Sequence, residues 1–311
     1  MEYCIYKFNF KTAVHIGSGK LSDGEMVMHA DTLFSALCHE ALLMDGEDML
    51  AELISYVNSG KLQFSDCFPF LQKNTYYIPK PMHAVPHDDA EPGTDRKAYK
   101  KLKYIPADRI SDYLDGNLDV VSENSSFAKH AGMYSVKTSA KVSESEDTLP
   151  YGIGTWSFPQ DSGLYFIMGY ESDEIYYFVS DLMDSLSYSG IGGKRTAGLG
   201  RFVCGIDKVP ESLLERLNAA DGSCFMSLSV SLPEDDELEH VIGDAEYLML
   251  KRSGFVASEK YAQTLQKKKD IYLFREGSCF TQRFDGQVAD VSDGGSHPVY
   301  RYARAMWMKV D

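Results

Sequence analysis

One short segment of the chain combines glycines and cations at a spacing that favours phosphate binding. Glycine adopts positive φ and has no Cβ, so its amides can approach phosphate oxygens closely, and cations add charge-assisted hydrogen bonds. Residues 190–200 read GIGGKRTAGLG, so two Gly-apolar-Gly triplets flank a basic centre. A tight turn with incidental glycines is the weaker alternative. We therefore expect a phosphate-binding loop, with candidate ligands Gly190, Gly192, Gly193, Lys194, Arg195, Thr196, Gly198 and Gly200.

This glycine loop (residues 190–200) matches neither of two common phosphate motifs. A P-loop requires Gly, four residues and Gly-Lys-Ser/Thr, but Tyr188 and Arg195 occupy its first and last positions. A dinucleotide fingerprint requires a third glycine where Arg195 stands. An apolar, helix-like segment over residues 175–186 precedes the loop, and an apolar strand over 202–206 follows it. A basic glycine loop between a helix and a strand favours a clamp on an RNA backbone.

Further segments strengthen this interpretation and carry a resemblance to a known family. They are HADTLFSAL (29–37), SDCFPF (65–70), IPKP (78–81), KRSGF (251–255) and HPVYRY (297–302). With the glycine loop, they resemble the RAMP superfamily of CRISPR proteins, and within it the fourth Csm subunit of type III-A complexes. The resemblance runs from about residue 4 to 308 and is weakest over 85–150. Ala30 departs from a frequent Ser, and Ser253 from a common Gly.

The resemblance implies an α+β fold of two ferredoxin-like (RRM-like) domains and a non-catalytic role. Members of that family bind the repeat-derived 5′ tag of the CRISPR RNA (crRNA). They also join the large polymerase/cyclase-like subunit to the repeating backbone RAMP subunits, in antiviral defence. We therefore expect these partners, no enzymatic activity, no cofactor and no metal.

Several residues outside the loop are further candidates for RNA contact. His15 and Ser18, after the first strand, are expected to line the same groove. Lys137 and Lys141 are candidates for a finger that kinks the RNA where tag meets guide, although a solvated surface lysine is an equally good explanation. Lys251 and Arg252 resemble a second basic turn at the domain seam, with an ordinary turn or helix C-cap as the alternative.

Length and composition agree with a two-domain protein. The chain has 311 residues, of which 44% are hydrophobic, enough for two domains with cores. We place the N-terminal domain at 1–207, with an irregular insertion at about 82–150, and the C-terminal domain at 208–311. The formal net charge of −15 opposes binding to a polyanion. Basic residues nevertheless cluster at 96–103, 267–269 and in the loops named above, which favours basic grooves on an acidic body.

The hydrophobic pattern predicts the elements that position the loop. Alternation over 4–16 indicates a strand, and Asp31 is a plausible N-cap for a helix with an apolar face that runs to Leu42. A second helix is expected over 49–58, strands over 62–67 and 164–170, then the helix that leads into the loop. This is the ferredoxin-like order. The C-terminal half shows strand patterns at 224–232, 247–251, 271–275 and 299–308, with a helix at 237–242.

The remaining features point to an intracellular chain without metal. The six cysteines form no Cys-x-x-Cys pair, and no apolar run approaches the roughly 18 residues of a membrane helix. The N-terminus begins Met-Glu-Tyr and lacks the basic start of a signal peptide, so we expect a cytoplasmic protein without membrane contact. His83, His87, Asp88 and Asp89 could bind a metal on a helix, but Pro81 and Pro86 oppose one.

Two other functions stay open at this point. His29 and Asp31 could form an acid/base pair, as in the related metal-independent endoribonucleases that process CRISPR RNA. Against this, more than 100 residues follow Gly200, whereas such enzymes end shortly after their glycine loop. An RNA-free structural adaptor is the second alternative, because the 12% aromatic content suits protein interfaces and base stacking equally well.

Overall fold

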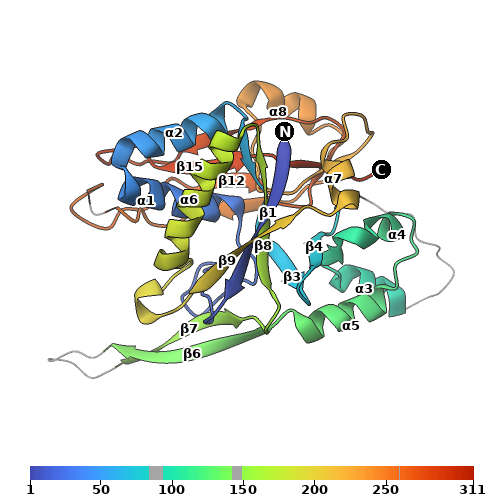
Figure 1. Cartoon of the computed structure of the whole chain (residues 1–311), viewed down its shortest axis with the longest axis horizontal. Helices are drawn as coiled ribbons and strands as arrows, with labels where there is room; N and C mark the ends of the chain where they lie inside the picture. The colour runs from blue at the N-terminus through green and yellow to red at the C-terminus, as the bar shows by residue number, and fades with distance from the viewer. Residues whose placement is uncertain (84–93, 142–148, 259) are drawn as a thin grey trace.

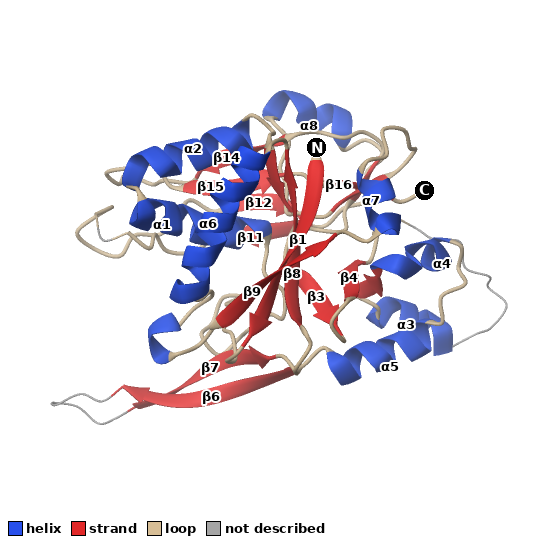
Figure 2. Ribbon diagram, viewed as in Figure 1, coloured by secondary structure: helices blue, strands red, loops and turns tan. Residues whose placement is uncertain are grey.

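The chain folds as a mixed α/β structure built on antiparallel sheets (Figures 1 and 2). The computed structural model describes residues 1–83, 94–141, 149–258 and 260–311. Within these residues, none of the helices is both long and apolar enough to cross a membrane. The helices are α1 (Ala30–Met44), α2 (Gly46–Asn58), α3 (Thr94–Lys101), α4 (Ile110–Leu114), α5 (Val120–His130), α6 (Asp173–Ser189), α7 (Glu211–Leu217) and α8 (Asp235–Val241).

The main sheet has the strand order β5-β4-β3-β8-β1-β9, and β2 also pairs with β8. Strand β1 runs between β8 and β9, and most of its side chains are buried, including Ile5 on one face and Tyr6 and Phe8 on the other. Helix α6 packs its apolar stripe on this sheet, and the Tyr6 hydroxyl lies 2.6 Å from Ser180 Oγ. The strands are β1 (Glu2–Phe10), β2 (Leu62–Phe64), β3 (Phe68–Leu71), β4 (Thr75–Pro79), β5 (Tyr104–Pro106), β8 (Gly163–Tyr170) and β9 (Phe202–Lys208).

The segment expected to be an irregular insertion is largely regular in its described part. Residues 94–130 form α3, β5, α4 and α5, and β5 extends the main sheet by pairing with β4. Strands β6 (Met133–Lys141) and β7 (Leu149–Ser157) form a long hairpin that extends away from the body (Figure 1). The sequence prediction failed here because many residues of these elements are polar or exposed, so their hydrophobic periodicity is weak.

The C-terminal half forms small sheets of short strands. The pairs are β13-β10-β16, β11-β12 and β14-β15. The strand expected over 224–232 ends at Ser227, because buried serines bond to the backbone themselves: Ser227 Oγ donates to Ser229 O and Ser229 Oγ to Arg304 O, both at 2.7 Å. The strands are β10 (Phe225–Ser227), β11 (Met249–Arg252), β12 (Ile271–Phe274), β13 (Cys279–Phe280), β14 (Gly286–Asp290), β15 (Tyr300–Arg304) and β16 (Trp307–Lys309).

One hydrophobic core joins the two halves of the chain. Tyr302, on β15, is fully buried and packs against Phe34 of α1 and Phe64 of β2. Its hydroxyl accepts a hydrogen bond from the Phe64 amide at 2.9 Å and lies 3.2 Å from the Phe64 carbonyl oxygen. The two halves therefore pack directly on one another rather than through a linker.

We predict that Tyr302→Phe lowers the free energy of unfolding by about 1–3 kcal/mol, because a buried backbone amide is left without its acceptor. Urea unfolding followed by fluorescence measures this. Tyr188→Phe is the matched control, since Tyr188 is 92% exposed. Equal stability of the two variants would contradict the assigned role of the hydroxyl.

Candidate nucleic-acid interface

The glycine loop (residues 190–200) is a closed turn between α6 and β9. Gly190 ends α6 with φ 74°, and the Ile191 amide donates to the Gly200 carbonyl at 3.0 Å. At Gly200, φ is 72° and a Cβ would lie 1.8 Å from the Ile191 carbonyl oxygen. At Gly192, φ is 86° and a Cβ would lie 2.6 Å from the His15 carbonyl oxygen. The glycines therefore allow close backbone packing as well as a tight turn.

The two cations of the loop point to different places. Arg195 lines the cavity described below, and its Nη1 donates to the Gly190 carbonyl at 3.3 Å. Lys194 adopts a left-handed conformation with φ 61°, and its Nζ lies 5.6 Å from the centre of the Tyr151 ring on β7. Thr196 and Gly198 are exposed beyond it. The loop thus presents one cation to the cavity and one to the β6–β7 hairpin.

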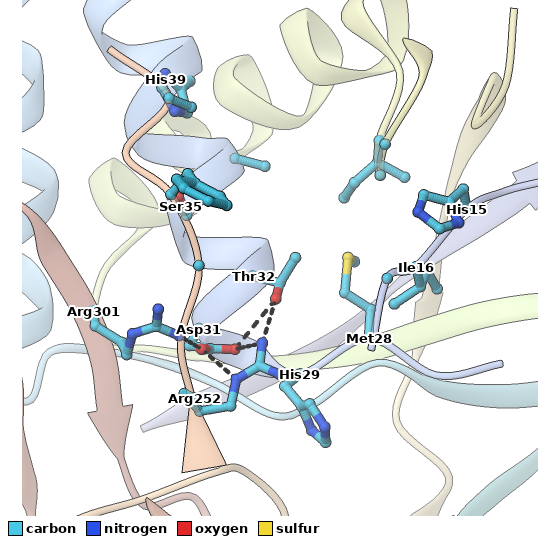
Figure 3. A pocket seen from close by; sticks show the side chains of 18 of the residues that line it. His15, Ile16, Met28, His29, Asp31, Thr32, Ser35, His39, Arg252 and Arg301 are labelled. Carbon is cyan, nitrogen blue, oxygen red and sulfur yellow. Dashed lines mark hydrogen bonds and ion pairs between the residues drawn. The ribbon is translucent and has the colours of Figure 1, made fainter. Parts of the chain in front are cut away.

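A cavity of about 320 Å³ lies where the loop faces the first helix and the C-terminal half (Figure 3). One wall is α1, and another is the glycine loop with residues 15–17. The C-terminal half supplies residues 252–255, 257, 268, 300 and 301. We call this cavity, with the glycine loop at its edge, the groove. It brings together segments from both halves that are distant in sequence.

Asp31 lies at the base of the groove and is bound by two arginines of the C-terminal half (Figure 3). Arg252 donates from Nε and Nη2 to the two Asp31 oxygens at 2.8 and 2.9 Å, and Arg301 donates from Nη1. Burial acts to raise the pKa of Asp31, but the two guanidinium groups lower it to about 2. Both arginines are therefore held by a buried carboxylate that stays ionised.

Asp31 is not the N-cap that the sequence indicated. Helix α1 begins at Ala30, one residue earlier, and the Ala30 amide donates to Asp66 Oδ1 at 2.8 Å. Leu42, expected on the buried face of this helix, is 42% exposed. A buried carboxylate from another segment satisfies the helix start, which local sequence could not reveal.

His29 lies beside this network and is buried at 3% exposure. Its Nδ1 lies 2.6 Å from Asp66 Oδ2 and 3.6 Å from Glu276 Oε2. Burial acts to lower the pKa of His29, but Asp66 and Glu276 together raise it to about 9. With this pKa the imidazole is charged at neutral pH and does not accept a proton. The carboxylates that it contacts are Asp66 and Glu276 rather than Asp31. This geometry does not favour an acid/base pair of His29 and Asp31.

Among the described residues, the side chains that could together hold a metal ion are these three: His29, Asp66 and Glu276. The candidate donor atoms of His29, Asp66 and Glu276 lie within 4.8 Å of one another. Because His29 and Asp66 already form a short hydrogen bond, we assign the group to charge pairing. Of the metal candidates from the sequence, His87, Asp88 and Asp89 lie outside the described residues, and His83 pairs with Glu246 at 3.1 Å.

The other sequence candidates lie at varying distances from the groove. His15 lines it, but its ring is 7% exposed, with Nδ1 2.6 Å from the Gly154 carbonyl oxygen, and its backbone accepts from the Gly193 amide at 2.8 Å. Ser18 is exposed and is not among the described residues that line the groove. Lys251 is exposed outside it and pairs with Asp270 at 2.7 Å.

The β6–β7 hairpin carries Lys137 on the face that meets the glycine loop. Lys137 pairs with Ile153, and Ser139 pairs with Tyr151, so Lys137 and Tyr151 share a face. Lys194 lies over the ring of Tyr151. Lys141 pairs with Leu149 at the end of the described hairpin, and its side chain lies outside the described part of the structure.

Several groove residues were missed by the sequence analysis. Ser35 and His39 continue the face of Asp31 at intervals of four along α1, a signal that could have found them. Lys268 also lines the groove. Burial lowers the pKa of His39, and the nearby cations Lys268 and Arg195 lower it further. Burial and the nearby Arg301 likewise lower the pKa of Lys268. Cations therefore converge in the groove. Phe255 and Tyr300 complete this set.

Stability should depend on pH through His29. A pKa raised from 6.5 to about 9 in the folded state stabilises the protein fully below pH 6.5, and this stabilisation is lost as pH rises through 9. We expect a decrease of roughly 3 kcal/mol across this window, measured by chemical unfolding at each pH. His29→Gln should flatten the profile, and the exposed control His240→Gln should not. A profile that His29→Gln leaves unchanged would disprove the assignment.

Comparison with known protein families places this geometry in context. Residues 7–203 match the RAMP superfamily, and residues 220–310 match the CRISPR Csm4 C-terminal domain. The chain is 36% identical over 311 residues to a CRISPR system Cms protein Csm4 of Mycobacterium tuberculosis, covering 100% of this chain and 98% of that protein. It is 35% identical over 320 residues to the Csm4 of Streptococcus thermophilus, covering all of both.

Solved structures agree on the fold. A chain in the crystal structure of a Csm3–Csm4 subcomplex of the type III-A CRISPR-Cas interference complex has a TM-score of 0.68 at 19% identity, with both chains fully covered. A chain of a Csm1–Csm4 cassette in complex with AMPPNP has a TM-score of 0.63 at 19% identity, covering 100% of this chain and 98% of that one. The full-length relatives and both family matches show that this chain belongs to the RAMP superfamily and, within it, to the Csm4 family of CRISPR proteins.

Proposed function

We propose that this chain is the crRNA-binding Csm4 subunit of a type III-A effector complex and that it holds the repeat-derived 5′ tag in the groove. One observation carries the proposal: the glycine loop, α1 and the C-terminal half converge on a cavity edged by cations. Lys268 and Arg195 lie close enough to His39 to lower its pKa, and Arg301 lowers the pKa of Lys268. A phosphate would offset this crowding of positive charge, because an anion stabilises the charged form of a neighbouring cation.

The glycine loop is suited to bind the sugar-phosphate backbone. The amides of Gly193, Gly198 and Gly200 already donate to carbonyl oxygens within the protein. The contact with phosphate that we propose therefore rests mainly on the cations Lys194 and Arg195. Of the other candidates, Arg252 acts as a support for the groove, since Nε and Nη2 donate to Asp31. The acidic net charge is compatible with this role, because the cations that matter are local and screening limits the reach of distant acids.

The β6–β7 hairpin is the candidate for the finger that kinks the RNA where tag meets guide. It extends beyond the body (Figure 1). Lys194 lies over the ring of Tyr151, two residue pairs from the outer end of the described hairpin. An RNA backbone that leaves the glycine loop along this contact would meet Lys137 next. Lys137 and Lys141 would then hold the backbone on both sides of the kink.

The partners follow from the relatives. One solved relative is found with Csm3 and another with Csm1. We propose that this chain likewise joins the large polymerase/cyclase-like subunit to the backbone RAMP subunit. We also propose that it works in the cytoplasm and without a cofactor, as its place in such a complex implies.

Two ferredoxin-like domains, 1–207 and 208–311, remain our proposal for the architecture. The sheet order β3-β8-β1-β9, with α1 and α6 between the strands in sequence, supports the first. The boundary near 207 is supported by the two family matches, which end at 203 and begin at 220. The C-terminal sheets are too short to carry the same argument by their pairing alone.

We propose that the chain is not an enzyme, and two alternatives remain testable. His29 is buried and hydrogen-bonded to Asp66, and its raised pKa does not suit a general base, which argues against metal-independent cleavage of repeat RNA. An RNA-free adaptor would leave the cations of the groove without a ligand. The buried, charged His29 therefore conflicts with the endoribonuclease, and the groove cations conflict with the RNA-free adaptor.

Binding should respond to salt in proportion to the number of phosphates that the protein neutralises. We expect Lys194→Ala/Arg195→Ala to weaken binding of a tag RNA and to reduce the slope of log K against log salt by about 0.7 to 1 for each cation removed from a phosphate. Fluorescence anisotropy at several salt concentrations measures both. Lys208→Ala, a change of charge on β9 outside the groove, is the control. An unchanged slope in the double variant would favour the adaptor.

Catalysis has a direct test. Purified protein incubated with its repeat RNA in EDTA should leave the RNA intact, as judged by gel electrophoresis. Specific cleavage that His29→Ala abolishes would overturn the non-catalytic proposal.

A further inference from the structure

An exposed aromatic ring faces the groove from the C-terminal half. Phe255 is 51% exposed, although a phenylalanine gains free energy when it is buried, and it lines the same cavity as Gly192 and Arg195. A single exposed apolar side chain is ordinary on a protein surface. One that lies inside a cationic cavity, opposite a phosphate-binding loop, calls for a ligand with both apolar and anionic parts.

The backbone around Phe255 is held in place. Phe255 forms a bridge with Lys267 across the loop that joins β11 to β12. The Val256 amide donates to the Gln266 carbonyl at 2.9 Å, and the Lys268 amide donates to the Gly254 carbonyl at 2.8 Å. The ring is therefore presented by a hydrogen-bonded platform, and little further ordering is needed when a ligand stacks on it.

The immediate surroundings of the ring are cationic. Lys267 Nζ lies 5.9 Å from the centre of the Phe255 ring, and Lys268 lines the cavity beside it. An aromatic face next to two lysines favours a nucleotide over an apolar protein segment, which would offer these cations no anion.

We propose that Phe255 is a base-stacking platform of the groove, on which one unpaired nucleobase of the bound RNA lies while the glycine loop holds its backbone. The inference rests on the proposed function and adds to it a residue on which the flat face of a base stacks. A volume of about 320 Å³ is at the lower end of small-ligand sites, which suits a single nucleotide. Stacking on exposed aromatics is a common way to bind single-stranded RNA, and it tolerates any base.

The test uses the full chain and a single-stranded RNA with the sequence of the host's repeat-derived 5′ tag. Phe255→Ala should weaken binding by about 5- to 150-fold, the range measured for removal of one stacking partner. Phe255→Trp should bind as well as the wild type, because any aromatic face serves. The salt slope should stay unchanged in Phe255→Ala, because the protein still neutralises the same phosphates.

Tyr188→Ala is the matched control. Tyr188 is an aromatic residue with 92% exposure, two residues before the start of the glycine loop, yet it is not among the described residues that line the cavity. This variant should bind the tag RNA as the wild type does. An equal decrease in affinity in Tyr188→Ala and Phe255→Ala would show a general effect of surface aromatics and overturn the proposal.

A series of tag RNAs, each with one abasic position, separates stacking from support of the fold. At one position, removal of the base should weaken binding to the wild type and have no further effect on Phe255→Ala. If the decrease in affinity in Phe255→Ala is the same for every abasic RNA, or is below twofold for the intact tag, the platform is disproved. In that case a weakened Lys194→Ala/Arg195→Ala variant would still support tag binding, whereas full affinity in both variants would disprove the proposed function as well.

Discussion

Two buried carboxylates, Asp31 and Asp66, hold the halves of this chain together, and the groove exists because of them. A buried charge is costly unless it is paired and hydrogen-bonded, so each carboxylate demands donors in a defined geometry. Asp31 takes its donors from Arg252 and Arg301 of the C-terminal half. Asp66 accepts from the amides of Ala30 and Val230, one from each half. Few relative placements of the halves satisfy all of these donors.

The same pairing determines which cations remain for a ligand. Arg252 and Arg301 direct donors to Asp31, so their charge supports the walls of the groove. Arg195 and Lys268 line the groove, and the described part of the structure shows no acidic partner within ion-pair distance of either. A protein with a net charge of −15 can thus present a local cationic surface. Discrimination against other polyanions would follow from the acidic surroundings.

The glycine loop combines a rigid frame with an unusual backbone. Its ends are joined by the hydrogen bond from Ile191 to Gly200, and its middle pairs with the backbone of His15. Lys194 is a non-glycine residue in the left-handed region, a conformation that costs free energy. The surrounding glycines absorb the other positive φ angles. The turn is therefore preformed, and a backbone ligand would meet cations that are already in position.

The sequence by itself determined the loop, the main strands and the first helices, because these depend on local patterns: glycine spacing, alternation in β1 and the apolar stripe of α6. Only the tertiary structure decided the roles of Asp31, Asp66 and His29, since their partners lie between 36 and 270 residues away. It also decided that residues 94–130 form helices and a strand, because packing outweighs their weak local preferences. Buried hydrogen bonds decided that the strand β10 ends at Ser227. Local structure depends on neighbouring residues and can be predicted from them, whereas charge pairing across the core depends on which distant residues the fold brings together.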